Sequence, residues 1–187
     1  MCNYILIMFV QTEITPNPNS LKFFPGKKVS NDSPIEITDK TLTDNELIKN
    51  ILSIDGVKGV FLTDEFLSVN KDQNTEWNDL KHIIISLIND FYSNGAELII
   101  DKNNTNKINK SFSEIEKKII NILETKVRPA VAKDGGDIKF KEFKNGVVTV
   151  NLQGSCSGCP SSTMTLKQGV QNLLCHYIPE IKEVIAI

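Results

Sequence analysis

The chain has few cysteines, almost no arginine and no long hydrophobic run. Its four cysteines are too unevenly spaced for the disulfide framework of a small secreted protein, so a reducing compartment fits better. Arg128 is the single arginine and Lys22 the first lysine, so the chain opens with neither the basic segment of a secretory signal nor the arginines of a transit peptide. We therefore expect a cytoplasmic protein of bacterial origin, or a protein of the mitochondrial matrix if the source is eukaryotic.

The missing features also narrow the range of partners. No apolar run approaches the roughly 20 residues that span a bilayer, so we expect no membrane segment. A formal net charge of -2 gives no electrostatic reason to expect a nucleic acid or an anionic membrane as partner. Apolar residues (40%) and charged residues (24%) occur as in an ordinary globular protein rather than a disordered one.

A polar segment divides the chain into two predicted domains. Residues 101–111 carry no apolar periodicity and lie between an apolar, strand-like run and a helix start, as expected of a linker. We therefore predict an N-terminal domain over 9–100 and a C-terminal domain over 112–187, with an extension outside both at 1–8. Both are small, and their mixed patterns predict an α+β protein.

The N-terminal part has the pattern of a mixed α/β domain. Two extended runs surround the turn-rich TPNPNS, which predicts a hairpin with a loop of several residues. A helix over Asn45–Ile54, a strand pair around Thr63–Glu65, a helix over Trp77–Tyr92 and a short closing strand in AELII complete it. The apolar stripe expected on the longer helix is Leu80, Ile83, Ile84, Leu87, Ile88 and Phe91.

The C-terminal part predicts the order α-β-β-α-β. Ser113 and Glu116 have the spacing of a capping box, and the helix that they start runs to KDGGD. The strands DIKFKEF and GVVTVNLQ flank Asn145-Gly146, a strong hairpin signal. A helix over Pro160–Tyr177 and a strand in KEVIAI follow. The stripes expected to face the core are Ile115, Ile119, Ile120, Leu123 and Val127 on the first helix, and Leu166, Val170, Leu173 and Tyr177 on the second.

The stretch LQGSCSGCPSS carries the expected chemistry. It places Cys156 and Cys159 in a loop of small residues between a strand and a helix, and Pro160 suits the first helical position. Cys159 then lies at the helix N-terminus, where backbone N–H groups and the helix dipole favour a thiolate. Both cysteines are candidate ligands of a metal or a cluster, and equally candidates for a redox dithiol.

A centre held by thiolates usually has four ligands, and the chain offers no third one nearby. Cys175 lies on the same predicted helix as the loop, about 24 Å from Cys159 at roughly 1.5 Å per residue, so we interpret it as a non-ligand thiol near the surface. Cys2 lies at the chain terminus and is a poor rigid ligand. Two copies related by a two-fold axis would complete the set with Cys156 and Cys159 of each.

Spacing alone leaves three interpretations of the loop open. An iron–sulfur site shared by two subunits is favoured, a thiol–disulfide oxidoreductase comes second, and a zinc-bridged dimer at the same cysteines third. A thioredoxin-like fold fits poorly, since there is room for only one helix and one strand after Cys159. We interpret His82 as structural and KDGGD as a turn. The sequence contains no nucleophile–base pair, so we expect a cluster carrier rather than an enzyme.

Several stretches together resemble a known family. RPAVAKDGGDIKF, GVVTVNLQGSCSGCPSSTMTLKQGVQNLL and YIPEIKEVIAI are similar to the C-terminal domain of the NifU-like (Nfu) iron–sulfur proteins. FVQTEITPNPNSLKFFPGKKV resembles the N-terminal domain of the mitochondrial and alphaproteobacterial members. The resemblance implies a homodimer that binds one shared [4Fe–4S] cluster through Cys156 and Cys159 of each subunit. It also implies a scaffold or carrier that passes the cluster to apo iron–sulfur enzymes, with upstream cluster-assembly proteins as further partners.

The N-terminal part shows no ligand set of its own. We therefore expect it to recognise the recipients or the assembly machinery rather than the cluster. In the family pattern Cys175 has no counterpart as a ligand, which agrees with its distance from the loop.

Overall fold

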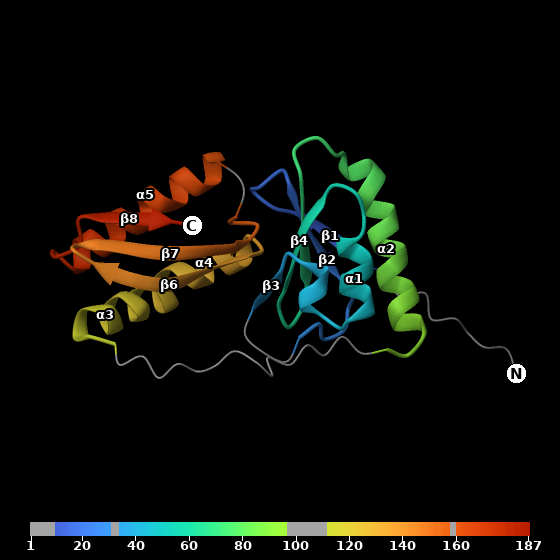
Figure 1. Cartoon of the computed structure of the whole chain (residues 1–187), viewed down its shortest axis with the longest axis horizontal. Coiled ribbons are helices and arrows are strands. Elements are labelled where there is room, and N and C mark those ends of the chain that lie inside the picture. The colour runs from blue at the N-terminus through green and yellow to red at the C-terminus, as the bar shows by residue number, and fades with distance from the viewer. Residues whose placement is uncertain (1–9, 31–33, 97–111, 158–159) are drawn as a thin grey trace, which may run out of the picture. The chain divides into compact units, whose positions relative to one another are not determined.

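The computed structural model describes residues 10–30, 34–96, 112–157 and 160–187, with side chains in the last range from Met164 onward. The chain divides into two compact units, Met1–Asn103 and Asn104–Ile187, each with its own hydrophobic core (Figure 1). The division falls within the predicted linker, which lies outside the described residues. The domain bounds 9–100 and 112–187 and the extension at 1–8 stay predictions.

The N-terminal unit pairs an antiparallel sheet with two α-helices on one of its faces (Figure 1). In the described residues the strand order is β1-β2-β5-β4-β3, so that the hairpins β1-β2 and β4-β5 lie side by side. The elements are β1 (Gln11–Ile14), β2 (Ser20–Phe24), β3 (Ile35–Ile37), the 3-10 turn η1 (Lys40–Leu42), α1 (Glu46–Leu52), β4 (Val57–Leu62), β5 (Leu67–Lys71) and α2 (Trp77–Ser93).

Strand alternation and helix caps explain why these residues form this layer pair. Leu21, Val69 and Val60 stand in register on neighbouring strands and are buried in the core with the helices. The Asn45 side chain caps α1, because its Oδ1 accepts a hydrogen bond of 3.2 Å from the Ile48 N–H. Both predicted hairpins and both predicted helices are confirmed.

Two details of the N-terminal unit differ from the prediction. Ile83 is 48% exposed, because the side chains that α2 buries follow one another at intervals of four, at Leu80, Ile84, Ile88 and Tyr92. The strand β3 has no counterpart in the prediction, since a run of three residues is too short to show alternation. Residues 97–100 of the predicted closing strand lie outside the described part of the chain.

The C-terminal unit packs its helices on one face of a mixed sheet with the order β6-β7-β8. β6 and β7 are antiparallel, and β8 runs parallel to β7. The elements are α3 (Glu114–Ile122), the π-helical turn η2 (Leu123–Val127), α4 (Arg128–Lys133), β6 (Gly136–Lys144), β7 (Val147–Gly154), α5 (Pro160–Tyr177) and β8 (Glu183–Ala186). The α+β class and the order α-β-β-α-β are confirmed.

The first helix of this unit is interrupted where one continuous helix was predicted. It begins with the predicted capping box of Ser113 and Glu116, but η2 separates α3 from α4. Pro129 explains the interruption: it has no N–H to donate, and its ring clashes with the carbonyl of Thr125, four residues earlier, in a regular α-helix. The wider π turn avoids that clash.

The hairpin between β6 and β7 forms as predicted. Asn145 and Gly146 both have positive φ, 53° and 83°, as a two-residue turn of the primed type requires. On α5, however, Tyr177 is 49% exposed, and the buried side chains are Val170 and Leu174, followed by Ile178 just after the helix. The predicted stripe was therefore wrong at its C-terminal end.

At the β8 edge of the sheet, a side chain accepts a hydrogen bond from one of the outward-pointing backbone N–H groups. The Val184 N–H, which points away from β7, donates a hydrogen bond of 3.1 Å to Oε1 of Gln171 on α5.

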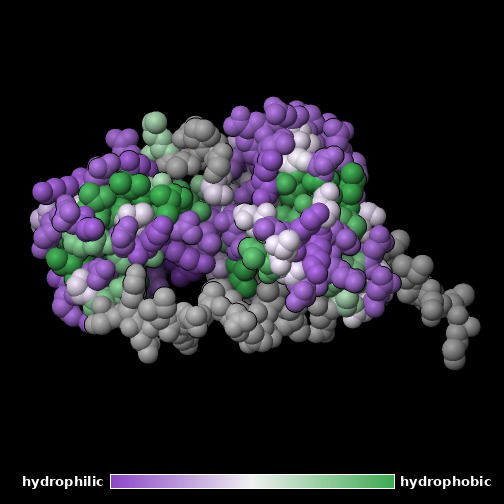
Figure 2. Space-filling model, viewed as in Figure 1, coloured by the Kyte–Doolittle hydropathy of each residue, from purple (hydrophilic) through white to green (hydrophobic). Residues whose placement is uncertain are grey.

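Hydrophobic surface is visible on this unit in the region of β8 (Figure 2), where Ile185 is 39% and Ile187 is 54% exposed. No helix in the described ranges is both long and apolar enough to cross a membrane.

Candidate functional site

The structure describes one of the two predicted ligands, Cys156, and leaves Cys159 outside the described residues. Cys156 follows β7 by two residues, and the residue is 8% exposed within the core of the C-terminal unit. α5 begins at Pro160, as predicted, so the loop leads directly into a helix N-terminus.

The Cys156 thiol packs directly against the backbone of Gly136. A Cβ atom at position 136 would overlap Cys156 Sγ, and would lie 2.8 Å from the Gln153 carbonyl oxygen and 2.9 Å from the Cys156 nitrogen. Gly136 pairs with Gly154 at the end of the β6-β7 ladder, which is where the chain enters the loop. The close approach of the thiol therefore depends on the absence of a side chain at 136.

Hydrogen bonds fix the loop on both sides of this contact. The Ser155 N–H donates to the Gly135 carbonyl at 3.1 Å, and the Ser155 hydroxyl donates to the Asp134 carbonyl. On the other side the Ser157 N–H and hydroxyl donate to the Gly154 carbonyl at 3.1 and 2.8 Å. KDGGD is a turn, as predicted, and it also anchors the cysteine loop.

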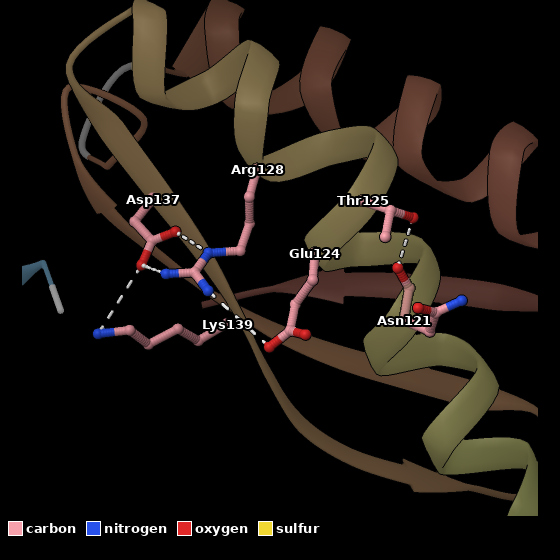
Figure 3. Close-up of polar contacts among 6 residues, drawn as sticks. All are labelled: Asn121, Glu124, Thr125, Arg128, Asp137 and Lys139. Atoms are coloured by element: carbon pink, nitrogen blue, oxygen red, sulfur yellow. Dashed lines mark hydrogen bonds and ion pairs between the residues drawn. The ribbon is translucent and has the colours of Figure 1, made fainter.

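An ion pair with a buried carboxylate lies next to this turn, and the sequence did not predict it. Arg128 Nε and Nη2 donate to the two carboxylate oxygens of Asp137 at 2.8 and 3.1 Å, and the Asp137 side chain is 4% exposed. Figure 3 shows the guanidinium against that carboxylate, with Lys139 and Glu124 at longer range, 3.9 Å in each case. The signal in the sequence was the single arginine, since bidentate pairing to a carboxylate is a property that lysine lacks.

Cys175 has a structural role within its own unit. Its Sγ donates to the Ile181 carbonyl at 3.3 Å, and the side chain is half-buried against the core rather than at the surface as predicted. It lies on α5, well beyond the helix start at the cysteine loop. In the described part of the chain no group of three or more His, Cys, Asp and Glu side chains could hold a metal ion.

Two sequence models of known families match the chain, one for each unit. Residues 10–95 match the family described as the scaffold protein Nfu/NifU N terminal, and residues 119–185 match the NifU-like domain. Both agree with the resemblance inferred from the sequence.

Full-length relatives carry both parts in the same order. "NifU-like protein 4, mitochondrial" of Arabidopsis thaliana is 42% identical over 184 residues, which cover 95% of this chain and 65% of the relative. "NFU1 iron-sulfur cluster scaffold homolog, mitochondrial" of Homo sapiens is 41% identical over 180 residues, covering 95% of this chain and 71% of the relative. The chain thus spans about two thirds of the length of these relatives.

A solved structure is also similar: a NifU-like protein from Saccharomyces cerevisiae has 30% identity and a TM-score of 0.48, covering 55% of this chain and 92% of that one. The identity across almost the whole chain, together with the two family models, shows that the chain belongs to the NifU-like (Nfu) family.

Proposed function

We propose that this chain is a scaffold or carrier for iron–sulfur clusters. Cys156 and Cys159 of two copies hold one [4Fe–4S] cluster as cargo between them and release it to apo-proteins. The observation that carries the proposal is the anchored loop. Cys156 is packed on the Gly136 backbone, and in the sequence Cys159 immediately precedes Pro160, the first residue of α5. The human relative is named as an iron–sulfur cluster scaffold, which supports the same cargo.

The chemistry of the loop suits temporary binding. Thiolates are the usual ligands of such clusters, and the N-terminus of α5 favours the thiolate form at the adjoining loop. Two ligands per chain leave the set of four incomplete until a second copy joins. Cys175 does not complete the set, because its thiol is hydrogen-bonded to the Ile181 carbonyl. Incoming thiolates of a recipient can displace the four thiolates one at a time, a ligand exchange without net oxidation or reduction.

The partners follow from this role. Recipients are apo iron–sulfur enzymes, and the cluster comes from upstream assembly proteins. The N-terminal unit, in which the described residues contain no ligand group, recognises one or both of them. The chain itself is a carrier rather than an enzyme. The named relatives are mitochondrial, so a eukaryotic source would place the chain in the matrix, and a bacterial source in the cytoplasm.

Anaerobic reconstitution with iron and sulfide tests the proposal. We expect about four irons and four sulfides per dimer, Mössbauer spectra of a [4Fe–4S] cluster, and a solution mass of two chains. Cys156→Ser and Cys159→Ser should each abolish the cluster, whereas the control Cys175→Ser should keep its spectrum. A zinc-loaded dimer that takes up no iron would contradict the proposal, and so would a monomer that cycles a Cys156–Cys159 disulfide.

A further inference from the structure

We propose that Arg128 is a positioning residue for Cys156, and that it acts through Asp137 and the turn between α4 and β6. The inference rests on the proposed function only where it concerns cluster loading. The effect of Arg128 on the Cys156 thiol is a property of the apo chain, and it is measured in the chain without a cluster.

The ion pair links the two elements on either side of the turn between α4 and β6. Arg128 is the first residue of α4 and Asp137 the second residue of β6, so the pair joins the two elements that flank the turn. Two hydrogen bonds, of 2.8 and 3.1 Å, fix both the separation and the relative plane of guanidinium and carboxylate. Because the carboxylate is almost fully buried, its removal from the guanidinium would leave a charge without adequate compensation.

The turn that the pair closes is the surface on which Cys156 rests. Gly136, adjacent to Asp137, contacts the thiol, while the carbonyls of Asp134 and Gly135 accept hydrogen bonds from Ser155. The residues from 134 to 136 therefore hold the entrance of the cysteine loop. A shift of β6 relative to α4 is transmitted to Cys156 with no flexible side chain in between.

Arginine is suited to this position in a way that lysine is not. An ammonium group can contact one carboxylate oxygen, but it lacks the planar fork that fixes the orientation of Asp137. The ammonium group of Lys139 already lies 3.9 Å from the Asp137 carboxylate, and the Lys139 side chain is 34% exposed. Arg128→Lys therefore retains the charge of the pair and removes its geometry.

Thiol reactivity in the full-length apo chain tests the inference. Reduced protein is alkylated with iodoacetamide under native conditions, and tandem mass spectrometry follows each cysteine. In Arg128→Lys we expect Cys156 to react at least about fivefold faster, the factor that corresponds to about 1 kcal/mol of local stability. Cys175, held at Ile181 in the same unit, is the internal control and should keep its rate. Circular dichroism and the thermal midpoint establish that the variant is folded.

Two further variants make the test decisive. Asp137→Asn keeps a hydrogen-bond acceptor in place of the carboxylate and should raise the Cys156 rate in the same way, which covers the case in which Arg128→Lys does not fold. Glu124→Gln removes only the 3.9 Å contact of Arg128 with an exposed carboxylate and should leave the rate unchanged. An unchanged Cys156 rate in folded variants, an equal rise at Cys175, or an equal effect of Glu124→Gln would each overturn the inference.

Cluster stability provides the second readout. The reconstituted Arg128→Lys chain should lose its cluster to an iron chelator faster than the native chain, and Glu124→Gln should not. If the native chain takes up no cluster, the proposed function fails while the alkylation result still decides the role of Arg128. If the native chain loads and Arg128→Lys retains the cluster equally well, Arg128 does not position the ligand.

Discussion

Position 136 requires glycine because there is no space for a side chain, and not because the backbone has a positive φ. An added Cβ would meet the Cys156 thiol and the Gln153 carbonyl, and backbone atoms cannot move aside cheaply. We expect Gly136→Ala to destabilise the C-terminal unit by about 1–3 kcal/mol, as overpacking does, and to reduce cluster loading. Urea unfolding measures the first effect and iron content the second.

Gly169 provides the matched control for this change. It lies in α5, and an added Cβ there meets nothing within 4 Å. Gly169→Ala should raise stability by about 0.5–1 kcal/mol, because alanine loses less backbone entropy in a helix. Equal behaviour of the two alanine variants would mean that the thiol does not press on Gly136.

Tyr92 allows a prediction of pH dependence at the residue scale. Burial raises the pKa of Tyr92 to about 12, and among the described residues its hydroxyl finds no hydrogen-bond partner. Since the folded pKa is above the ordinary value of about 10, the contribution of the neutral phenol to stability is complete below pH about 10 and is lost as the pH rises through about 12. Tyr92→Phe should shift alkaline unfolding of the N-terminal unit to higher pH; a tyrosinate absorbance titration with no late-ionising group would contradict this.

Among the elements, α3 depends on its capping box. Ser113 Oγ accepts from the Glu116 N–H at 3.3 Å, and the Glu116 carboxylate accepts from the Ser113 N–H at 2.8 Å. Ser113→Ala should cost about 1 kcal/mol in denaturant unfolding of the C-terminal unit. Lys118→Ala, an exposed change in the same helix, should stay within about 0.5 kcal/mol. Equal losses in both variants would assign the effect to helix propensity rather than to the cap.

Most elements could be predicted because their signals are local. The capping box, the Asn145-Gly146 turn and the proline that opens α5 are each contained in a few neighbouring residues. The ion pair Arg128–Asp137 and the contact of Gly136 with Cys156 join residues from different elements, so no periodicity reveals them. The π turn combines both cases: Pro129 was visible, but tertiary packing decides whether a proline ends a helix or widens it.

At the scale of the whole molecule, the two units carry opposite charge. Residues 10–96 contain eight lysines against thirteen acidic residues, and residues 112–187 contain ten basic against eight acidic residues. We expect the acidic N-terminal unit to attract basic surfaces of recipients and so to speed transfer. A chain of residues 112–187 should then load a cluster normally but deliver it more slowly.

Ionic strength distinguishes this electrostatic role from a specific fit. The difference in transfer rate between the full chain and residues 112–187 should shrink as salt is added. At 0.1 M salt, the attraction between exposed charges more than about 10 Å apart is largely screened. A difference that is independent of salt would indicate recognition through contacts rather than charge. Failure of residues 112–187 to load a cluster would show that the N-terminal unit takes part in binding it.

The side chain of Gln171 has a consequence for how copies of this chain meet. A sheet edge with free amides invites another chain to add a strand, and such pairing is hard to undo. By accepting the bond from the Val184 N–H, Gln171 occupies a donor that an added strand would need. Strand addition at the β8 edge is thereby disfavoured, which favours the proposed dimer that the shared cluster holds together. In that proposed dimer, we expect the two copies to separate once the cluster has been delivered.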